Sequence, residues 1–264
     1  MNIKKALLTT AVTAALGVSS VTANAFEQFT IDETILTTAL PDFFIPTIDT
    51  VVADTITGTY REVIDFNADF SFTTTAFAEL NGYTLDGEEL DSITETTIGI
   101  NYGLYATFDA AGYATGTGGF QGDSATLSLF LDVLNDTTAD VTTGLGVIIS
   151  DDVDDILLAS TSDLIDGLGV VNPAGSAFFG AFGLLFDSVS LTANGARGDE
   201  FFVEPDPFYL ITNITGDFDS FSSDILEPQL IQGQVGVVFR VPEPGILGLM
   251  GIALLGLGLS RRKS

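Results

Sequence analysis

A regular alternation of apolar and polar side chains constrains the fold of this chain more than any other feature. From Ile98 to Phe108 every second residue is apolar, and glycine, asparagine, tyrosine and threonine stand between them. The pattern recurs at Leu127, Leu129 and Leu131 and again at Val235, Val237 and Phe239. Neighbouring side chains of a strand point to opposite faces, so a repeat of two predicts β-strands with one buried face.

Turn signals separate these strand-like runs. They are Asn81–Gly82, Asp86–Gly87, residues 112–122, Asn194–Gly195 and Pro205–Asp206–Pro207. Many short strands with frequent turns predict an all-β fold, an antiparallel β-sandwich or jelly-roll-like domain. Residues 156–169 depart from this pattern, because they follow a run of aspartates and suggest a short helix with an acid-rich first turn.

The folded part is predicted to extend over residues 26–240 as one ectodomain, because no internal repeat and no Pro/Ser-rich linker divides it. The chain has no cysteine, so disulfide bonds cannot stabilise it. Its stability must therefore come from an apolar core, to which 21 phenylalanines and abundant Ile, Leu and Val contribute.

This segment is strongly acidic. It holds 35 of the 36 acidic residues but only three basic ones, Arg61, Arg197 and Arg240, which gives a formal net charge of −32. Such a field repels nucleic acids and bare anionic polysaccharides, but allows basic partners or anionic polymers bridged by divalent cations. The simpler interpretation is an acidic coat that keeps an exported protein solvated.

The N-terminus has the features of a secretory signal peptide over residues 1–25. Two lysines precede an apolar, small-residue core, and Ala23-Asn24-Ala25 forms a small-x-small cleavage site. The mature chain is therefore predicted to begin at Phe26.

The C-terminus, residues 241–264, combines three elements. The triplet Pro242, Glu243 and Pro244 precedes an apolar stretch, Gly245–Leu259, and the basic residues Arg261, Arg262 and Lys263 follow. The stretch predicts a transmembrane sorting helix whose basic end stays in the cytoplasm.

This order resembles the PEP-CTERM sorting signal of Gram-negative bacteria. The resemblance implies that exosortase, an intramembrane peptidase, cuts near the triplet. It also implies a precursor that is inserted transiently in the inner membrane and a product at the cell surface or in the extracellular matrix. The alternative is a permanent C-terminal anchor.

The ectodomain also contains a series of phrases in a characteristic order. They are FEQFTIDE from Phe26, DTITGTYREVIDF from Asp54, NYGLYATF from Asn101, SLFLD from Ser128, FFVEPDPFYLITN from Phe201 and GQVGVVF from Gly233. Together they resemble the flocculation-associated PEP-CTERM proteins. That resemblance implies a role in floc formation and in retaining extracellular polysaccharide, and it brings no catalytic residues.

Several catalytic chemistries are excluded by composition. Residues 26–240 contain no His, Cys or Lys, so they cannot form a Ser-His-Asp triad, a Cys nucleophile, a Schiff base or a His-ligated metal site. A carboxylate-dependent glycosidase stays open, because two carboxylates suffice. Composition thus favours a non-catalytic protein, and the resemblance implies adhesion by retaining extracellular polysaccharide, with a specific carbohydrate-binding module as the alternative and a glycosidase third.

Calcium is the one cofactor that the residue types favour. Asp151, Asp152, Asp154 and Asp155 offer four carboxylates within five residues, and hard cations prefer oxygen ligands. The run lacks the central glycine and distal glutamate of an EF-hand. A solvated acidic turn and an aspartate-capped helix start are the other interpretations.

Overall fold

The computed structural model describes residues 27–36, 50–115, 119–142, 146–171, 178–217 and 228–240. The strands are β1 (Phe29–Asp32), β2 (Thr50–Ala53), β3 (Thr55–Phe66), β4 (Ser71–Leu85), β5 (Glu88–Glu89), β6 (Gly103–Thr115), β7 (Gly119–Asp132), β8 (Thr138–Thr142), β9 (Gly146–Ser150), β10 (Ile156–Thr161), β11 (Leu164–Val171), β12 (Phe178–Asp187), β13 (Phe202–Glu204), β14 (Tyr209–Asp217) and β15 (Gln229–Arg240). A 3₁₀ turn, η1 (Ala193–Gly195), and one helical turn, α3 (Gly198–Phe201), lie between β12 and β13.

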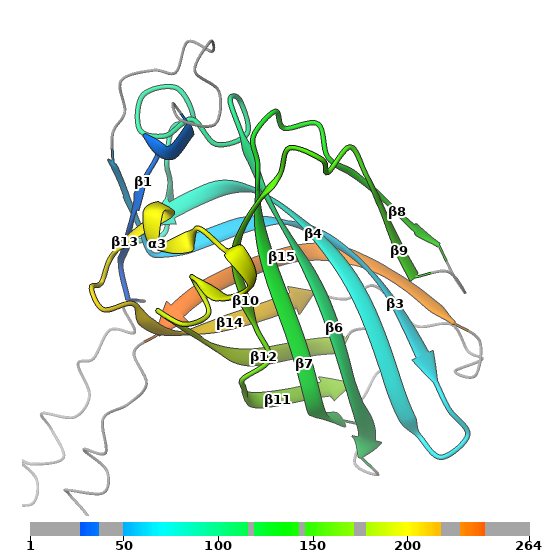
Figure 1. The fold of residues 1–264 in the computed structure, drawn as a ribbon. Coiled ribbons are helices and arrows are strands. Elements are labelled where there is room, and N and C mark those ends of the chain that lie inside the picture. Colours follow the sequence, from blue (N-terminus) through cyan, green and yellow to red (C-terminus); the bar gives the residue numbers. More distant parts are fainter. Residues whose placement is uncertain are drawn as a thin grey trace, which may run out of the picture.

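The largest sheet has ten strands, and its pairing closes on itself. Antiparallel pairs lead from β3 through β4, β6, β7, β11, β12, β14 and β15, and β15 pairs again with β3. In Figure 1, β3, β4, β6 and β7 form one layer, and β11, β12, β14 and β15 form a second layer that crosses behind it. The expected all-β, antiparallel and sandwich-like fold is confirmed, with both edges of the sandwich joined by strand pairing.

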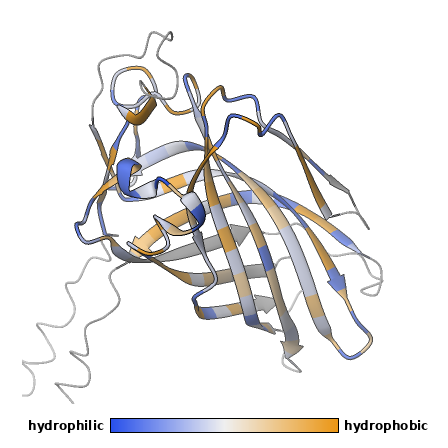
Figure 2. Cartoon of the chain, viewed as in Figure 1, coloured by the Kyte–Doolittle hydropathy of each residue, from blue (hydrophilic) through white to orange (hydrophobic). Residues whose placement is uncertain are grey.

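The two-residue alternation defines the inside of this closed sheet. Leu127, Leu129 and Leu131 on β7 are buried, and so are Val235, Val237 and Phe239 on β15. Figure 2 shows the resulting bands of apolar and polar residues along the strands. Burial of the apolar residues supplies the driving force that a chain without disulfides requires.

Glycines make room inside the sheet for phenylalanine rings. A Cβ on Gly169 would lie 1.8 Å from the Phe120 ring, and one on Gly112 would lie 2.8 Å from the Phe72 ring. The rings of Phe72 and Phe120 then pack edge to face with their centroids 5.5 Å apart. At these positions the absence of a glycine side chain leaves the space that an aromatic ring occupies.

A smaller sheet in the order β13-β1-β2 lies at one end of the closed sheet, together with α3. Its aromatic contacts reach the last strand, since the Phe29 and Phe239 rings are 4.8 Å apart. The backbone N–H of Glu27 donates to the carbonyl of Phe239 at 3.0 Å. The first described residue and the end of β15 therefore lie together. We call this end of the closed sheet the terminal end.

Three local expectations were wrong. Residues 156–169 form β10 and most of β11 instead of a helix, because their backbone pairs with β7 and β12. Ile98 is buried but Ile100 is 55% exposed, because Gly99 with φ +77° closes a turn and β6 begins only at Gly103. Asn81–Gly82 lies within β4, beside an irregularity in its pairing with β3.

Within the described ranges, no helix is long and apolar enough to cross a membrane. The predicted C-terminal span, Gly245–Leu259, lies outside those ranges.

Candidate functional site

The residues predicted for sorting and processing lie outside the described part of the chain. They are Ala23, Ala25, Phe26, Pro242, Glu243, Pro244, Arg261, Arg262 and Lys263. The adjoining fold is nevertheless defined, because β15 ends at Arg240, two residues before the triplet. In the sequence, the predicted sorting signal therefore directly follows the strand that closes the sheet.

The four aspartates proposed for calcium form the link between β9 and β10. Asp151 adopts φ +64°, and it is exposed together with Asp152 and Asp154, whereas Asp155 is half-buried. The link is thus a turn, as one of the alternative interpretations held, and it is not a helix start. We call residues 151–155 the acidic turn.

A threonine connects the acidic turn to the link between β7 and β8. Thr137 Oγ1 donates to Asp155 Oδ2 at 2.8 Å and lies 3.3 Å from the Asp151 carbonyl. Asp132 accepts from the backbone N–H groups of Asp136 and Thr137 at 3.1 and 2.9 Å. The two chain crossings that lead into and out of the β8–β9 hairpin are therefore held together.

Like charges accumulate around these crossings. Partial burial raises the pKa of Asp155, and the charges of Asp132 and Asp154 raise it further. Desolvation likewise raises the pKa of Asp136, with added repulsion from Asp154, Asp132 and Asp151. Removing a carboxylate from water and surrounding it with anions both disfavour its charged form.

The cluster has no preformed metal geometry: within the described ranges, no group of three or more acidic side chains converges as a metal site requires. Asp155 Oδ1 is buried and has no hydrogen-bond partner of regular geometry among the described residues. The Tyr105 hydroxyl nevertheless lies close enough to interact with the Asp155 carboxylate. Calcium binding by the acidic turn stays a prediction.

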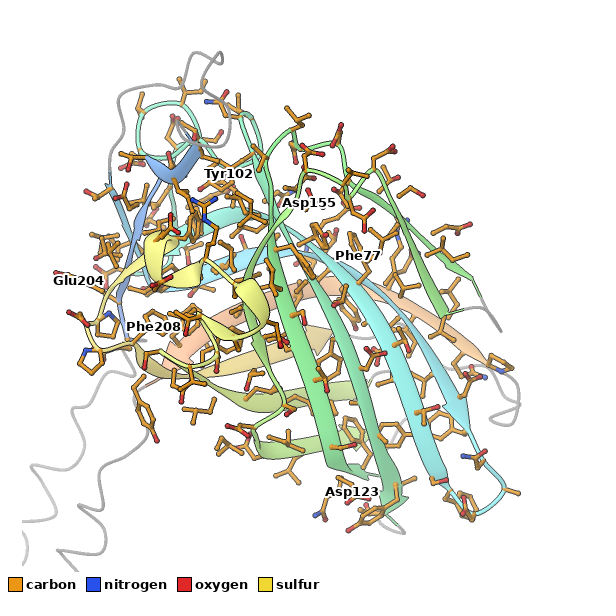
Figure 3. All side chains as sticks on the ribbon, viewed as in Figure 1. Phe77, Tyr102, Asp123, Asp155, Glu204 and Phe208 are labelled. Carbon is orange, nitrogen blue, oxygen red and sulfur yellow. The ribbon has the colours of Figure 1, made fainter. Side chains whose placement is uncertain are left out.

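The β8–β9 hairpin covers an aromatic stack on the outside of the closed sheet. Tyr105 lies between Phe77 and Phe130, with ring centroids 5.2 and 4.8 Å away. Arg61 Nη1 donates to the Ala139 carbonyl at 3.2 Å and ties the hairpin to β3. Figure 3 shows Phe77 beneath the hairpin and Asp155 near its base. Tyr102 and Tyr105 stand on opposite faces of the alternating run, yet both are buried, because the hairpin covers Tyr105.

Buried carboxylates elsewhere are engaged in structural hydrogen bonds. Glu33 is fully buried and accepts from Thr96 Oγ1, Thr97 N, Thr97 Oγ1 and Tyr102 Oη at 2.6 to 3.0 Å. Glu62 is also buried and accepts from Thr74 Oγ1, and burial raises its pKa to about 7. These carboxylates point into the packed interior and do not face the outer surface.

Uncharged side chains predominate on the outer side of β4, β6 and β7, where the exposed carboxylates are Glu79, Asp109 and Asp123. This side carries a set of hydroxyl side chains, which we call the hydroxyl face: Thr73, Thr75, Thr107, Ser124, Thr126 and Ser128. Asp109 lies among them and accepts from Thr75 Oγ1 at 2.9 Å, and the exposed Asp123 directly precedes Ser124. Thr73, Ser124 and Thr126 are exposed, and the other three are half-buried.

Sequence reasoning missed this face because threonine suits half-buried strands everywhere. The signal that could have revealed it is the lack of Asp and Glu in residues 71–75 and 124–128 of so acidic a chain.

Comparison with known families identifies a motif at the C-terminus. Residues 240–263 match the model of the PEP-CTERM protein-sorting motif. The chain therefore carries a sorting signal that is processed by exosortase, and it is exported and sorted to the cell surface. No curated protein and no solved structure matches the chain.

Proposed function

We propose that this protein retains extracellular polysaccharide at the cell surface without catalysis, and thereby promotes adhesion or floc formation. The hydroxyl face is the observation that carries the proposal. An exported domain with a net charge of −32 repels anionic surfaces, yet Thr73, Ser124 and Thr126 present exposed hydroxyls on an outer surface where uncharged side chains predominate. The resemblance to flocculation-associated PEP-CTERM proteins supports the same role.

A deletion strain of the producing bacterium tests this function. Cells that lack the protein should disperse while they still synthesise and release the polysaccharide, and expression of the complete chain should restore the flocs. Cells that remain aggregated, or that stop making the polymer, would contradict a role in retention.

We further infer that residues 26–240 do not catalyse a reaction. Support comes from the missing His, Cys and Lys and from the structural use of buried carboxylates such as Glu33. Incubation of the protein with the producer's polysaccharide should release no reducing ends. Release that a single Asp or Glu substitution abolishes would instead indicate a glycosidase.

A carbohydrate-binding module specific for one polysaccharide is the second candidate, favoured by the exposed tyrosine beside the hydroxyl face, Tyr113. The two functions differ in selectivity. A specific module binds one polymer far more tightly than others of the same charge, whereas a general retention protein binds them similarly.

A further inference from the structure

The closed sheet has an end opposite the terminal end, which we call the far end. β3 begins beside Val238 near the terminal end and extends over 12 residues to the turn at Asn67–Phe70. At about 3.3 Å per residue, the path along β3 from one end to the other is roughly 36 Å. In Figure 3, Phe208 marks the terminal end and Asp123 the far end. The sorting motif begins at Arg240, so the far end is the one turned away from it.

An uncharged row of side chains crosses the outer surface at the far end. Strand register places Ser71, Tyr113, Gln121 and Leu168 opposite one another on β4, β6, β7 and β11. Tyr113 is 40% and Leu168 62% exposed, and the Tyr113 hydroxyl donates to Gln121 Oε1 at 2.8 Å. Adjacent strands lie about 4.8 Å apart, so the row is roughly 14 Å long.

This row continues the hydroxyl face. Tyr113 follows Ala111 and Asp109 on the same side of β6, and Gln121 precedes Ser124 on β7 across an irregularity in the pairing. Tyr60, Tyr83, Tyr102 and Tyr105 are buried, so Tyr113 is the exposed tyrosine that adjoins the hydroxyl face. Its ring combines an apolar surface with a polar hydroxyl held in place by Gln121.

We propose that the row at the far end and the adjoining hydroxyl face form a direct binding surface for a neutral polysaccharide. This inference rests on the proposed function and specifies its partner. A neutral polymer offers hydroxyl groups to the threonines and serines, and the apolar faces of its sugar rings fit against Tyr113. The carboxylates within this surface are Asp109, which Thr75 already engages, and the exposed Asp123, which keeps its contact with water at the edge of the row.

The negative net charge of the domain disfavours binding of anionic polysaccharides. An anionic polysaccharide would approach a domain with a net charge of −32 and would need divalent cations to overcome repulsion. A neutral polymer meets no such repulsion, so its binding should be indifferent to chelators.

The binding surface can be observed directly by fluorine NMR. The chain contains six tyrosines, and in 3-fluorotyrosine-labelled protein only Tyr113 and Tyr209 report from exposed positions. The probe is polysaccharide extracted from the producer's flocs and separated by ion exchange into neutral and anionic fractions. The neutral fraction should shift the Tyr113 signal in the presence of chelator, and Tyr209, at the terminal end, should stay unchanged.

Two substitutions locate the site. Tyr113→Ala and Thr126→Asp should each weaken binding of the neutral fraction by about tenfold, the first by removing the ring and the second by adding charge. Tyr209→Ala and Thr50→Asp make the same changes at exposed positions away from this surface and should leave binding unchanged. Equal melting temperatures within each pair exclude a folding defect.

The outcomes separate the site from the function. If the unmodified protein binds neither fraction, the proposed function fails and the site with it. If it binds the neutral fraction and the Tyr113 and Thr126 variants bind equally well, only the site is wrong. Binding restricted to the anionic fraction and abolished by chelator would overturn the site and support cation bridging by the acidic surface.

Discussion

The backbone N–H of Glu27 donates a 3.0 Å hydrogen bond to the carbonyl of Phe239, which joins the start of the domain to its last strand. That strand, β15, lies between β14 and β3 and closes the sheet. The pairing cannot be completed until residues 229–240 have been exported. The sorting motif begins at Arg240, so the strand that closes the sheet and the sorting signal are neighbours in the sequence.

Cooperative folding should therefore depend on whether a truncated chain keeps β15. A chain that stops after Arg240 should keep the cooperative thermal unfolding of the complete ectodomain, whereas a chain that stops after Pro228 loses β15 and should not fold cooperatively. Circular dichroism during heating distinguishes the two. Cooperative unfolding of the shorter chain would show that the closed sheet is dispensable.

Proteolytic processing should leave β15 intact. We expect the mature protein to begin at Phe26 and to lose its apolar stretch and basic tail by cleavage close to Pro242, Glu243 and Pro244. Intact-mass measurement of surface-extracted protein checks both ends. A mature species that keeps Lys263 would indicate a permanent anchor.

Glu33 should be important for stability although it is a buried polar residue. Its carboxylate accepts four hydrogen bonds in a fully buried position, from Thr96, Thr97 and Tyr102. Glu33→Gln places an amide donor against these donors, so we expect a loss of about 2–3 kcal/mol in the free energy of unfolding. Glu88→Gln, at an exposed position on β5, should change it by less than about 0.5 kcal/mol. Denaturant titration measures both, and equal values would mean that the hydrogen bonds to Glu33 contribute little.

Strand identity was predictable wherever the alternation extended along a whole strand. Leu127 and Leu129 face the core as expected. On a sheet with one buried face, an alternating strand can bury its apolar side chains in only one orientation. Residues 156–169 were not predictable, since their apolar run suits a helix or a buried strand equally and only pairing with β7 and β12 decides between them.

The closure of the sheet and the position of the hydroxyl face were beyond local sequence patterns. Both depend on which strands become neighbours, such as β15 beside β3, and on a distant hairpin that covers Tyr105 while leaving Tyr113 exposed. The acidic turn was recognisable as a charge cluster. Its link to Thr137 was not, because 18 residues separate Thr137 from Asp155.

Glu62 should make stability depend on pH. Burial raises its pKa to about 7 in the folded protein, whereas the unfolded value is near 4.5. Below pH 4.5 both states are protonated and stability is intact. Stability then falls as the pH rises from 4.5 through 7, because the unfolded chain ionises while burial keeps the folded carboxyl protonated, and the loss is complete above the folded pKa. Glu62→Gln removes this loss, so at pH 8 the variant should be more stable than the unmodified protein by about 3 kcal/mol.

Thermal unfolding of both proteins between pH 5 and pH 8 checks this expectation. Glu79→Gln, at an exposed position on β4, should follow the unmodified protein throughout. A stability difference between Glu62→Gln and the unmodified protein that does not grow with pH would mean that Glu62 ionises without a burial cost.

Calcium should stabilise the protein through the acidic turn. Repulsion from Asp132 and Asp154 adds to the desolvation that raises the pKa of Asp155, so a divalent cation there relieves unfavourable charge. Because no metal geometry is preformed within the described ranges, we expect a response only at millimolar Ca²⁺. Replacing Asp151, Asp152, Asp154 and Asp155 by Asn should abolish the rise in melting temperature that Ca²⁺ causes in the unmodified protein.

A matched control separates this effect from general screening. Asn substitution at four other exposed aspartates, Asp65, Asp123, Asp199 and Asp206, removes the same charge and leaves the acidic turn intact. We expect this control to keep the full calcium response, and monovalent salt at equal ionic strength to give a smaller one, because it only screens charges over about 8 Å. An equal loss of response in both variants would assign the calcium effect to the net charge of the domain, and no response in the unmodified protein would exclude calcium as a ligand.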